Sequence, residues 1–338
     1  MNQTINFVHH IIKKAINDQA TDIHFIPGEE KVKLYFRING YRMYYSSLPF
    51  KKYQTLLSYL KFTSKMDIGQ TRKPQSGTIP YQIKNDHYSL RISTLPSLSM
   101  ESIAIRILKQ SIHYALHRLF LFPRQSLRLM ELLQKPSGII LFTGPTGSGK
   151  TTTMYGIVVA KVKETNCHTI TLEDPIEKNL ENVLQVQVNE STGFTYDTGL
   201  KAALRHDPDI ILVGEIRDKE TAQFAFRAAN TGHLVISTLH ARNTVGTIHR
   251  LKEMNITTTD LKQNLIAIAS TQLLPLSVPK YSNERAAIIE LLTGNELLTS
   301  IHEIDPLQDN HPQITFQRLR RLAYAYGFIN DPIRPTPP

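Results

Sequence analysis

The chain has 338 residues, of which 41% are hydrophobic and 20% charged, enough to fill about two domains of roughly 100–200 residues. This composition excludes an intrinsically disordered protein. The single cysteine, Cys167, excludes a disulfide framework, a four-cysteine zinc module and a CxxC redox motif. Since no apolar run approaches the ~18 residues of a membrane helix and no signal peptide opens the chain, we expect a cytoplasmic protein.

The net charge of +10 is concentrated in the first part of the chain. Residues 1–130 hold 19 Lys and Arg against 7 Asp and Glu, whereas residues 131–338 hold 20 against 22. A basic segment of this kind indicates an anionic partner, such as nucleic acid, a membrane surface or an acidic protein. A lysine-rich solvated surface explains the charge equally well, so composition leaves both interpretations open.

The first part of the chain is predicted to form an α+β domain with an antiparallel sheet. Apolar residues recur at helical spacing in two segments, and period-two alternation marks two strand pairs. Asn39-Gly40 is a strong signal for the first hairpin turn. The helices are expected over residues 5–16 and 53–62, and the strands over 32–38, 41–45, 88–94 and 103–107.

The second hairpin is predicted to place two arginines together. If its turn is centred between Ser97 and Leu98, Ser89 faces Arg106 and Arg91 faces Ala104. Both guanidinium groups then leave the same face of the sheet.

Residues 110–123 lack a clear period and contain a proline, so we expect domains over 1–109 and 124–338 with a linker between them. Beyond the linker, apolar runs of about five residues alternate with helical segments, which is typical of a parallel sheet covered on both faces. The expected strands cover residues 138–143, 169–172, 209–213 and 233–239, and the expected helices 150–162, 198–205, 219–230 and 243–254.

A phosphate-binding loop follows the first strand of this series. The run GPTGSGKT at residues 144–151 matches GxxxxGK[ST], between an apolar strand and a helix. Its glycines let backbone N–H groups face phosphate oxygens, Lys150 can reach the β- and γ-phosphates, and the Thr151 hydroxyl can coordinate Mg²⁺. The sequence therefore predicts ATP and Mg²⁺ as cofactors, bound by Gly144, Pro145, Thr146, Gly147, Ser148, Gly149, Lys150, Thr151 and Thr152.

Carboxylates end two other strands of the predicted sheet. Glu215 follows the run IILVG, and Glu173 and Asp174 end the run TLED before a proline. Carboxyl ends of parallel strands meet at the same edge as the phosphate loop, which favours a catalytic or metal role. The pattern does not decide whether Glu173 or Glu215 orients the attacking water, and Asp174 is expected to support them.

His233 and His240 lie on either side of the strand expected after this one. Because the two residues are seven apart, an ideal strand cannot bring both to one site. His240, at the carboxyl end, is the better candidate, and His233 is a second supporting candidate.

The runs GPTGSGKTTTMY, TLEDPIE, LRHDPDIILVGEIRD and TGHLVISTLHA together resemble the PulE-type ATPases of type II secretion, type IV pili and competence pili. In that family they would be the Walker A, Asp box, Walker B and His box. The resemblance extends to ATDIHFIP at residues 20–27 and PQSG at 74–77, and so covers nearly the whole chain.

This resemblance implies a homo-hexamer in which a PAS-like domain and a RecA-like P-loop ATPase domain, ending in a helical part, move against each other. It also implies that Arg91 and Arg106 contact the nucleotide phosphates. The expected partner is a polytopic inner-membrane platform protein, so the protein would lie at the cytoplasmic face of the membrane.

Three departures from the family narrow the expectation. The chain has no four-cysteine zinc element, so no zinc site is expected. Arg242 stands where many relatives have Asn, and the basic character of the usual Gln-Arg-Leu is lost at Leu273. The compact build is similar to the short ATPases of Gram-positive competence pili, with a pilus retraction ATPase as the alternative.

A nucleic-acid motor on the same core is the rival that the basic first domain suggests. The sequence shows no recognisable nucleic-acid module, so no direct nucleic-acid partner is expected. A small-molecule kinase would need an acceptor pocket, for which the sequence offers no candidate. The best-supported function is therefore an ATP-driven motor for competence pilus assembly and DNA uptake.

Overall fold

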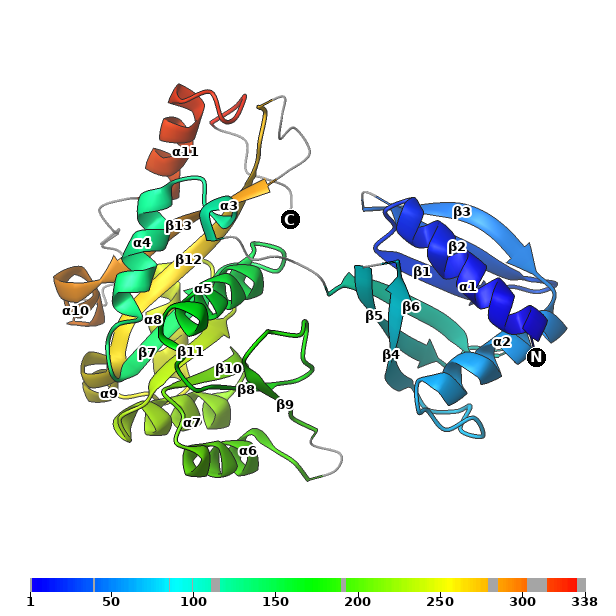
Figure 1. Cartoon of the computed structure of the whole chain (residues 1–338), viewed down its shortest axis with the longest axis horizontal. Coiled ribbons are helices and arrows are strands. Elements are labelled where there is room, and N and C mark those ends of the chain that lie inside the picture. The colour runs from blue at the N-terminus through cyan, green and yellow to red at the C-terminus, as the bar shows by residue number, and fades with distance from the viewer. Residues whose placement is uncertain are drawn as a thin grey trace. The chain divides into compact units, whose positions relative to one another are not determined.

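The computed structural model divides the chain into two compact units, residues 1–113 and 114–338 (Figure 1). No helix in the part that the structure describes is both long and apolar enough to cross a bilayer. The described residues are 2–38, 40–84, 86–98, 100–110, 116–189, 193–278, 285–302 and 315–332.

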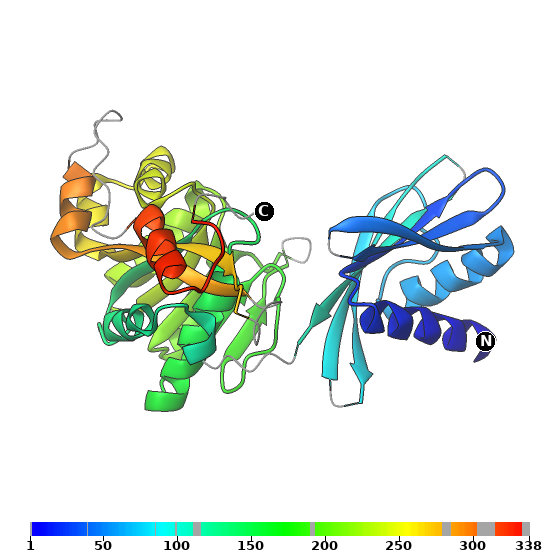
Figure 2. The same cartoon turned by 90° about the horizontal axis from the view of Figure 1, so that it is seen from above.

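The first unit is a six-stranded antiparallel sheet in the order β3-β2-β1-β6-β5-β4. The apolar stripes of its two helices and the inward side chains of its strands form one core, which leaves the other sheet face open (Figure 2). The elements are α1 (Asn2–Asn17), β1 (Asp22–Pro27), β2 (Val32–Ile38), β3 (Tyr41–Leu48), α2 (Phe50–Thr63), β4 (Gln75–Ile83), β5 (Asp86–Leu95) and β6 (Ser102–Lys109).

The hairpin between β5 and β6 corrects the predicted register. Arg91 lies directly opposite Arg106, and Ala104 lies opposite Ser93, so the pairing is shifted by two residues from the expected one. A shift of two preserves the side-chain faces, because the strand period is two. Arg91 and Arg106 therefore do share a face. The first hairpin pairs Ile38 with Tyr41 as its predicted turn requires, although Asn39 itself lies outside the described residues.

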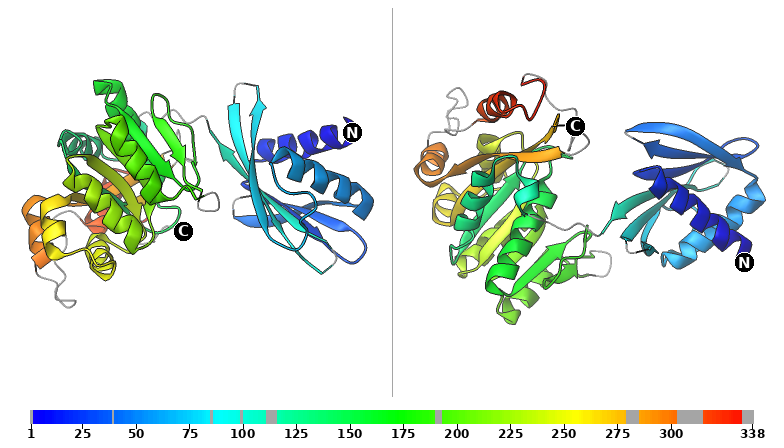
Figure 3. Two further views of the ribbon diagram at one scale, coloured as in Figure 1. Left: turned by 90° about the horizontal axis from the view of Figure 1, so that it is seen from below. Right: turned by 45° about the horizontal axis from the view of Figure 1, so that its top comes forward.

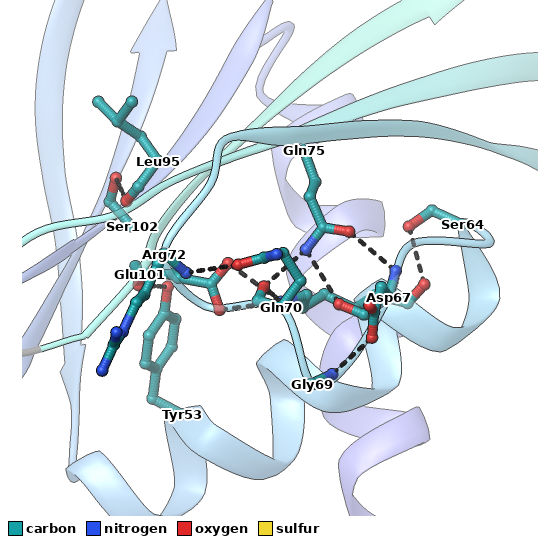
Figure 4. A network of polar contacts seen from close by, with 11 residues as sticks. Tyr53, Ser64, Asp67, Gly69, Gln70, Arg72, Gln75, Leu95, Glu101 and Ser102 are labelled. Carbon is teal, nitrogen blue, oxygen red and sulfur yellow. Dashed lines mark hydrogen bonds and ion pairs between the residues drawn. The ribbon is translucent and has the colours of Figure 1, made fainter. Parts of the chain in front are cut away.

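A buried ion pair fixes the long connection between α2 and β4 (Figure 4). Lys61 of α2 donates to both carboxylate oxygens of Glu101 at 3.0 Å and to the Gln70 carbonyl at 2.7 Å. Gln75 closes the same loop by donating to the Gln70 and Asp67 carbonyls. The lysine and the carboxylate are 1% and 2% exposed, so each neutralises a charge that would be costly to bury alone.

The second unit contains a seven-stranded sheet in the order β13-β12-β7-β11-β10-β8-β9, parallel except for β13. Its first elements are α3 (Leu116–Leu119), α4 (Pro123–Leu132), β7 (Gly138–Thr143), α5 (Lys150–Thr165), β8 (Thr169–Glu173), β9 (Leu184–Gln187), α6 (Tyr196–Ala203) and a 3₁₀ turn (Leu204–His206). The remaining ones are β10 (Ile210–Ile216), α7 (Lys219–Asn230), β11 (Leu234–Leu239), α8 (Thr244–Glu253), α9 (Thr258–Asn264), β12 (Leu265–Pro275), β13 (Arg285–Thr293), α10 (Gly294–His302) and α11 (Phe316–Ala325).

Helices cover both faces of this sheet, as the apolar runs predict (Figure 3). Successive residues of β7 alternate between two cores: Ile139 belongs to the core that includes side chains of α6 to α10, and Ile140 to the core that includes side chains of α4 and α5. Such alternation between two apolar layers explains why the strand reads as one continuous hydrophobic run.

Two boundaries differ from the prediction. Residues 116–119 form α3, which packs against α4 and α5, so this part of the expected linker belongs to the second unit; residues 111–115 lie outside the description. The C-terminal part is not only helical, because β12 and β13 pair over nine residue positions before α10 and α11. This antiparallel pair extends the sheet beyond β7 and flanks the phosphate loop.

Candidate functional site

The phosphate loop connects β7 to α5, as the sequence predicts. Gly149, the residue before α5, has φ of +90°, a conformation that strongly favours glycine. A Cβ atom at Gly144 would lie 2.7 Å from the Ser148 Oγ and 2.9 Å from the Thr271 carbonyl oxygen. The two glycines therefore allow the loop to lie tightly against the end of β12.

Lys150 is held inside this loop. Its Nζ donates to the carbonyls of Gly144 at 2.8 Å and Pro145 at 2.9 Å. Burial lowers the pKa of Lys150, while the nearby carboxylates of Glu215 and Glu177 oppose that shift. The two carboxylates offset only part of the cost of burying the ammonium charge. Negatively charged phosphate oxygens would therefore bind it strongly and favour its protonated form.

Threonine side chains hold the strand ends around the loop in register. Thr143, the last residue of β7, donates to the Leu239 carbonyl at the end of β11 at 3.0 Å. Thr238 in turn donates to the Gly214 carbonyl in β10 at 2.9 Å. These bonds join the carboxyl ends of three neighbouring strands. β7 leads into the phosphate loop that ends at Lys150, His240 directly follows β11, and Glu215 is the second-last residue of β10.

Glu215 lies at the centre of a polar cluster at this edge. Its Oε2 is 3.7 Å from the His240 Nε2, and its Oε1 accepts a hydrogen bond from Arg217. Arg217 also lies 3.6 Å from the Asp174 carboxylate. Arg217 was not singled out from the sequence; it follows Glu215 by two positions and lies directly after the end of β10. The Glu215 side chain is 27% exposed, so water can reach it.

Glu173 faces the interior instead. Tyr155 of α5 and Thr171 of β8 donate to its carboxylate, and the Gln185 amide donates from 3.2 Å. The residue is only 3% exposed. Three protein donors thus occupy a carboxylate that is nearly closed to solvent, so Glu173 links α5 to β8 and β9 rather than facing the phosphate loop's solvent side.

The structure separates the two histidines. His240 follows β11 at the phosphate-loop edge, where burial and the Lys150 charge lower its pKa below the ordinary 6.5, against the effect of Glu215. His233 precedes the same strand at the opposite edge, where its ring lies 3.1 Å from the Thr231 hydroxyl. A strand of six residues spans about 20 Å, so the supporting role expected for His233 is corrected: it does not reach the site.

A cavity of about 510 Å³ lies beside the phosphate loop. Arginines from three separate segments line it together with Thr146 and Phe316: Arg242 after β11, Arg285 of β13 and Arg320 of α11. No acidic residue is among its described lining residues. Leu273, which stands where the family pattern has a basic residue, also lines this cavity. The positive charge of the cavity comes instead from three elements that are distant in the chain, so a motif in one segment could not reveal it.

A metal ion at this edge would find few protein ligands among the described residues. Among the residues that the structure describes, no three His, Cys, Asp or Glu side chains are grouped as metal ligands would be. Thr151, in the first turn of α5, is half-buried beside Lys150. This arrangement fits Mg²⁺, which characteristically takes one or two protein ligands and completes its shell with nucleotide phosphates and water.

Arg91 and Arg106 lie in the other unit, side by side on the open face of its sheet. The Arg106 side chain is 64% exposed and its Nε donates to the Asp22 carboxylate at 2.9 Å. Their predicted contact with the nucleotide phosphates stays a prediction.

The chain is similar to known proteins over most of its length. Residues 1–315 match the family described as "Type II/IV secretion system protein". The competence protein ComGA of Bacillus subtilis (strain 168) is 41% identical over 333 residues, which cover 95% of this chain and 94% of that protein. The type IV pilus assembly ATPase PilB of Acinetobacter baylyi (strain ATCC 33305 / BD413 / ADP1) is 38% identical over 82% of this chain and 50% of its own length.

Solved structures share the fold over nearly the whole chain. The pilus retraction motor PilT with bound ADP has a TM-score of 0.74 at 28% identity, covering 97% of this chain and 96% of PilT. The ATPase DotB of Legionella pneumophila has a TM-score of 0.73 at 22% identity, covering 96% and 93%, and supports the fold alone. The phosphate loop, the family match and the competence relatives agree: this chain belongs to the type II/IV secretion system protein family.

Proposed function

We propose that this chain is an ATP-hydrolysing motor that drives assembly of a competence type IV pseudopilus for DNA uptake. The observation that carries the proposal is the cluster of Lys150, Glu215 and His240 at one sheet edge, in a chain 41% identical to a competence protein. The retraction motor is the alternative, and PilT is less similar to this chain, at 28% identity.

Each group at the edge has a defined task in phosphoryl transfer. The loop amides and Lys150 bind the phosphates, and the Thr151 hydroxyl holds Mg²⁺, which neutralises charge on the phosphate oxygens. Glu215, the exposed carboxylate, orients the attacking water, while neutral His240 and Arg217 hold that carboxylate in place. Asp174 acts indirectly, through Arg217. Glu173 supports the site from inside through Tyr155.

The cavity beside the loop takes the nucleoside part of ATP. It is continuous with residues 145–148 of the loop and is large enough for a base and a ribose. Arg242, Arg285 and Arg320 can stack on the base and donate to sugar oxygens.

The small unit supplies the remaining positive charge. In this proposal it is a PAS-like domain and the large unit is RecA-like, and both belong to a homo-hexamer. Arg91 and Arg106 contact the phosphates, because phosphoryl transfer needs more cations than Lys150 alone provides. The protein acts at the cytoplasmic face of the membrane on a polytopic platform protein, without binding nucleic acid directly.

A complementation experiment tests the cellular role. A strain in which this gene is deleted would be supplied with the wild-type gene or with Lys150→Ala, and transformation by added DNA would be scored. We expect the wild type to restore transformation and Lys150→Ala to leave it at the deletion background. Restored transformation with Lys150→Ala at wild-type protein levels would contradict the proposal.

Nucleic-acid dependence separates the rival motor. Turnover that rises on addition of DNA, with a stimulation that falls steeply with salt, would favour a nucleic-acid motor, because phosphate contacts release counterions. We expect turnover to be independent of added DNA.

A further inference from the structure

A row of charged residues crosses the open face of the small unit's sheet. Directly paired positions on neighbouring strands run from Arg42 in β3 through Arg37 in β2, Asp22 in β1 and Arg106 in β6 to Arg91 in β5. Side chains at such positions stand about 5 Å apart at Cβ. Asp22 is thus the only carboxylate among four guanidinium groups in the five described positions of this row.

Asp22 contacts Arg106 in a specific way. Its Oδ1 accepts from the Arg106 Nε at 2.9 Å, and its Oδ2 accepts from the Thr21 hydroxyl at 2.8 Å. The Arg37 Nε lies 3.9 Å away on the other side. The Asp22 side chain is 10% exposed, whereas that of Arg106 is 64% exposed. The buried Asp22 carboxylate therefore binds the Nε of Arg106, while most of the Arg106 side chain is exposed to solvent.

Asp22 is ionised in this position. Burial by itself raises the pKa of Asp22, but hydrogen bonds from Arg106 and Thr21 outweigh that effect and place the pKa below its ordinary 3.8. The ionised Asp22 carboxylate lies on β1 between Arg37 of β2 and Arg106 of β6, so its negative charge offsets the repulsion between these two guanidinium groups.

The planar shape of the guanidinium group explains why the Asp22–Arg106 hydrogen bond matters for phosphate binding. An arginine bound through Nε keeps both Nη groups in a fixed fork, and a phosphate is recognised best by such a pair of parallel donors. An unrestrained arginine would lose rotamer entropy each time it met a phosphate. A lysine at this position has a single nitrogen, so it cannot bind Asp22 through one nitrogen and present two others to a phosphate in a fixed planar fork.

We propose that Asp22 is a positioning residue of the ATP site: it fixes the Arg106 guanidinium through Nε and so directs the two Nη groups at the nucleotide phosphates. The inference rests on the proposed role of Arg106 at the phosphates. It adds a residue of β1, the strand with the shared ATDIHFIP run, to the residues on which turnover depends.

A double-mutant cycle on the full chain tests this. ATP turnover would be measured for wild type, Asp22→Asn, Arg106→Ala and the double variant, with thermal unfolding as a check of folding. We expect Arg106→Ala to lower kcat by about 100-fold and Asp22→Asn by about 10-fold, with KM for ATP changed less than threefold in each. Because Asp22 acts through Arg106, the double variant should match Arg106→Ala. The control is Asp86→Asn, which removes an exposed partner of Lys109 on the same sheet and should keep wild-type kcat.

Each failure has its own signature. Wild-type kcat in Asp22→Asn, or a double variant whose loss is the product of the two single losses, would overturn the positioning role while Arg106 keeps its function. Wild-type kcat in Arg106→Ala would instead overturn the proposed function of Arg106, and the inference with it. If Asp22→Asn does not fold, Arg106→Lys decides: we expect a kcat as low as in Arg106→Ala, and a wild-type kcat with lysine would contradict a held fork.

Discussion

Glu215 and Glu173 end neighbouring parallel strands of one sheet, yet their side chains face different surroundings. Glu215 is partly exposed beside His240 and Arg217, while Glu173 is buried under Tyr155, Thr171 and Gln185. The sequence places both carboxylates at the correct edge but cannot show which way each one turns, because that depends on side chains from other elements. Because Glu215 is open to solvent beside the phosphate loop and Glu173 is not, we propose that Glu215 orients the water.

Paired substitutions test this assignment. We expect Glu215→Gln to lower kcat for ATP hydrolysis by about 100-fold or more with little change in KM, since it removes the base from the exposed edge. Glu173→Gln should act mainly on stability, by about 1–3 kcal/mol, because its amide group turns a donor toward other buried donors. The reverse pattern, a larger kcat loss in Glu173→Gln with unchanged stability, would contradict the assignment.

The pH dependence of turnover should report His240. Burial and the positive charges of Lys150, Arg250 and Arg217 lower its pKa, against the effect of Glu215, and so keep it neutral at pH 7. A histidine with a lowered native pKa binds its proton only below the ordinary 6.5, and the imidazolium would then pair with the Glu215 carboxylate. We expect kcat to be constant above about pH 6.5 and to fall below it.

The variant His240→Gln identifies the group responsible, since glutamine cannot titrate. Its acid limb should move down toward the range of carboxyl groups, near pH 4. An acid limb that stays where it is in the wild type would show that another group controls turnover.

At the scale of elements, the connection between α2 and β4 depends on one buried ion pair. Lys61→Met leaves the Glu101 carboxylate buried without its ammonium, and we expect it to lower the free energy of unfolding by about 3–5 kcal/mol. The matched change Lys109→Met breaks an exposed pair with Asp86 and should cost less than about 1 kcal/mol. Denaturant unfolding of the full chain measures both; equal small losses would show that the buried pair does not hold this loop.

Periodicity predicted some elements well and left others out for identifiable reasons. β2, β7 and the helix α5 have clear patterns, and the structure confirms them. β1 and β4 are interrupted by polar residues and by Pro80 on an edge strand, so their alternation is hard to recognise. β12 and β13 are buried strands without a motif, and their partnership depends on contacts between distant segments.

At the scale of the whole molecule, part of the uneven charge distribution can be assigned to one surface. Part of the basic excess of residues 1–130 lies in the arginine row of the small unit's open face, where Asp22 holds Arg106. Such a row suits phosphate groups of a nucleotide as well as those of nucleic acid, which is why composition left both open. The site motifs could be predicted because they are contiguous, whereas the arginine cavity and Asp22 needed the fold.

The central claim is that the edge formed by Lys150 and Glu215 hydrolyses ATP. Steady-state phosphate release by the purified full-length chain with ATP and Mg²⁺ tests it most directly, with Lys150→Ala measured alongside and its folding checked by thermal unfolding. We predict clear turnover in the wild type and turnover at the background level in a folded Lys150→Ala. Substantial phosphate release by folded Lys150→Ala, or none by the wild-type chain in its assembled state, would contradict the account.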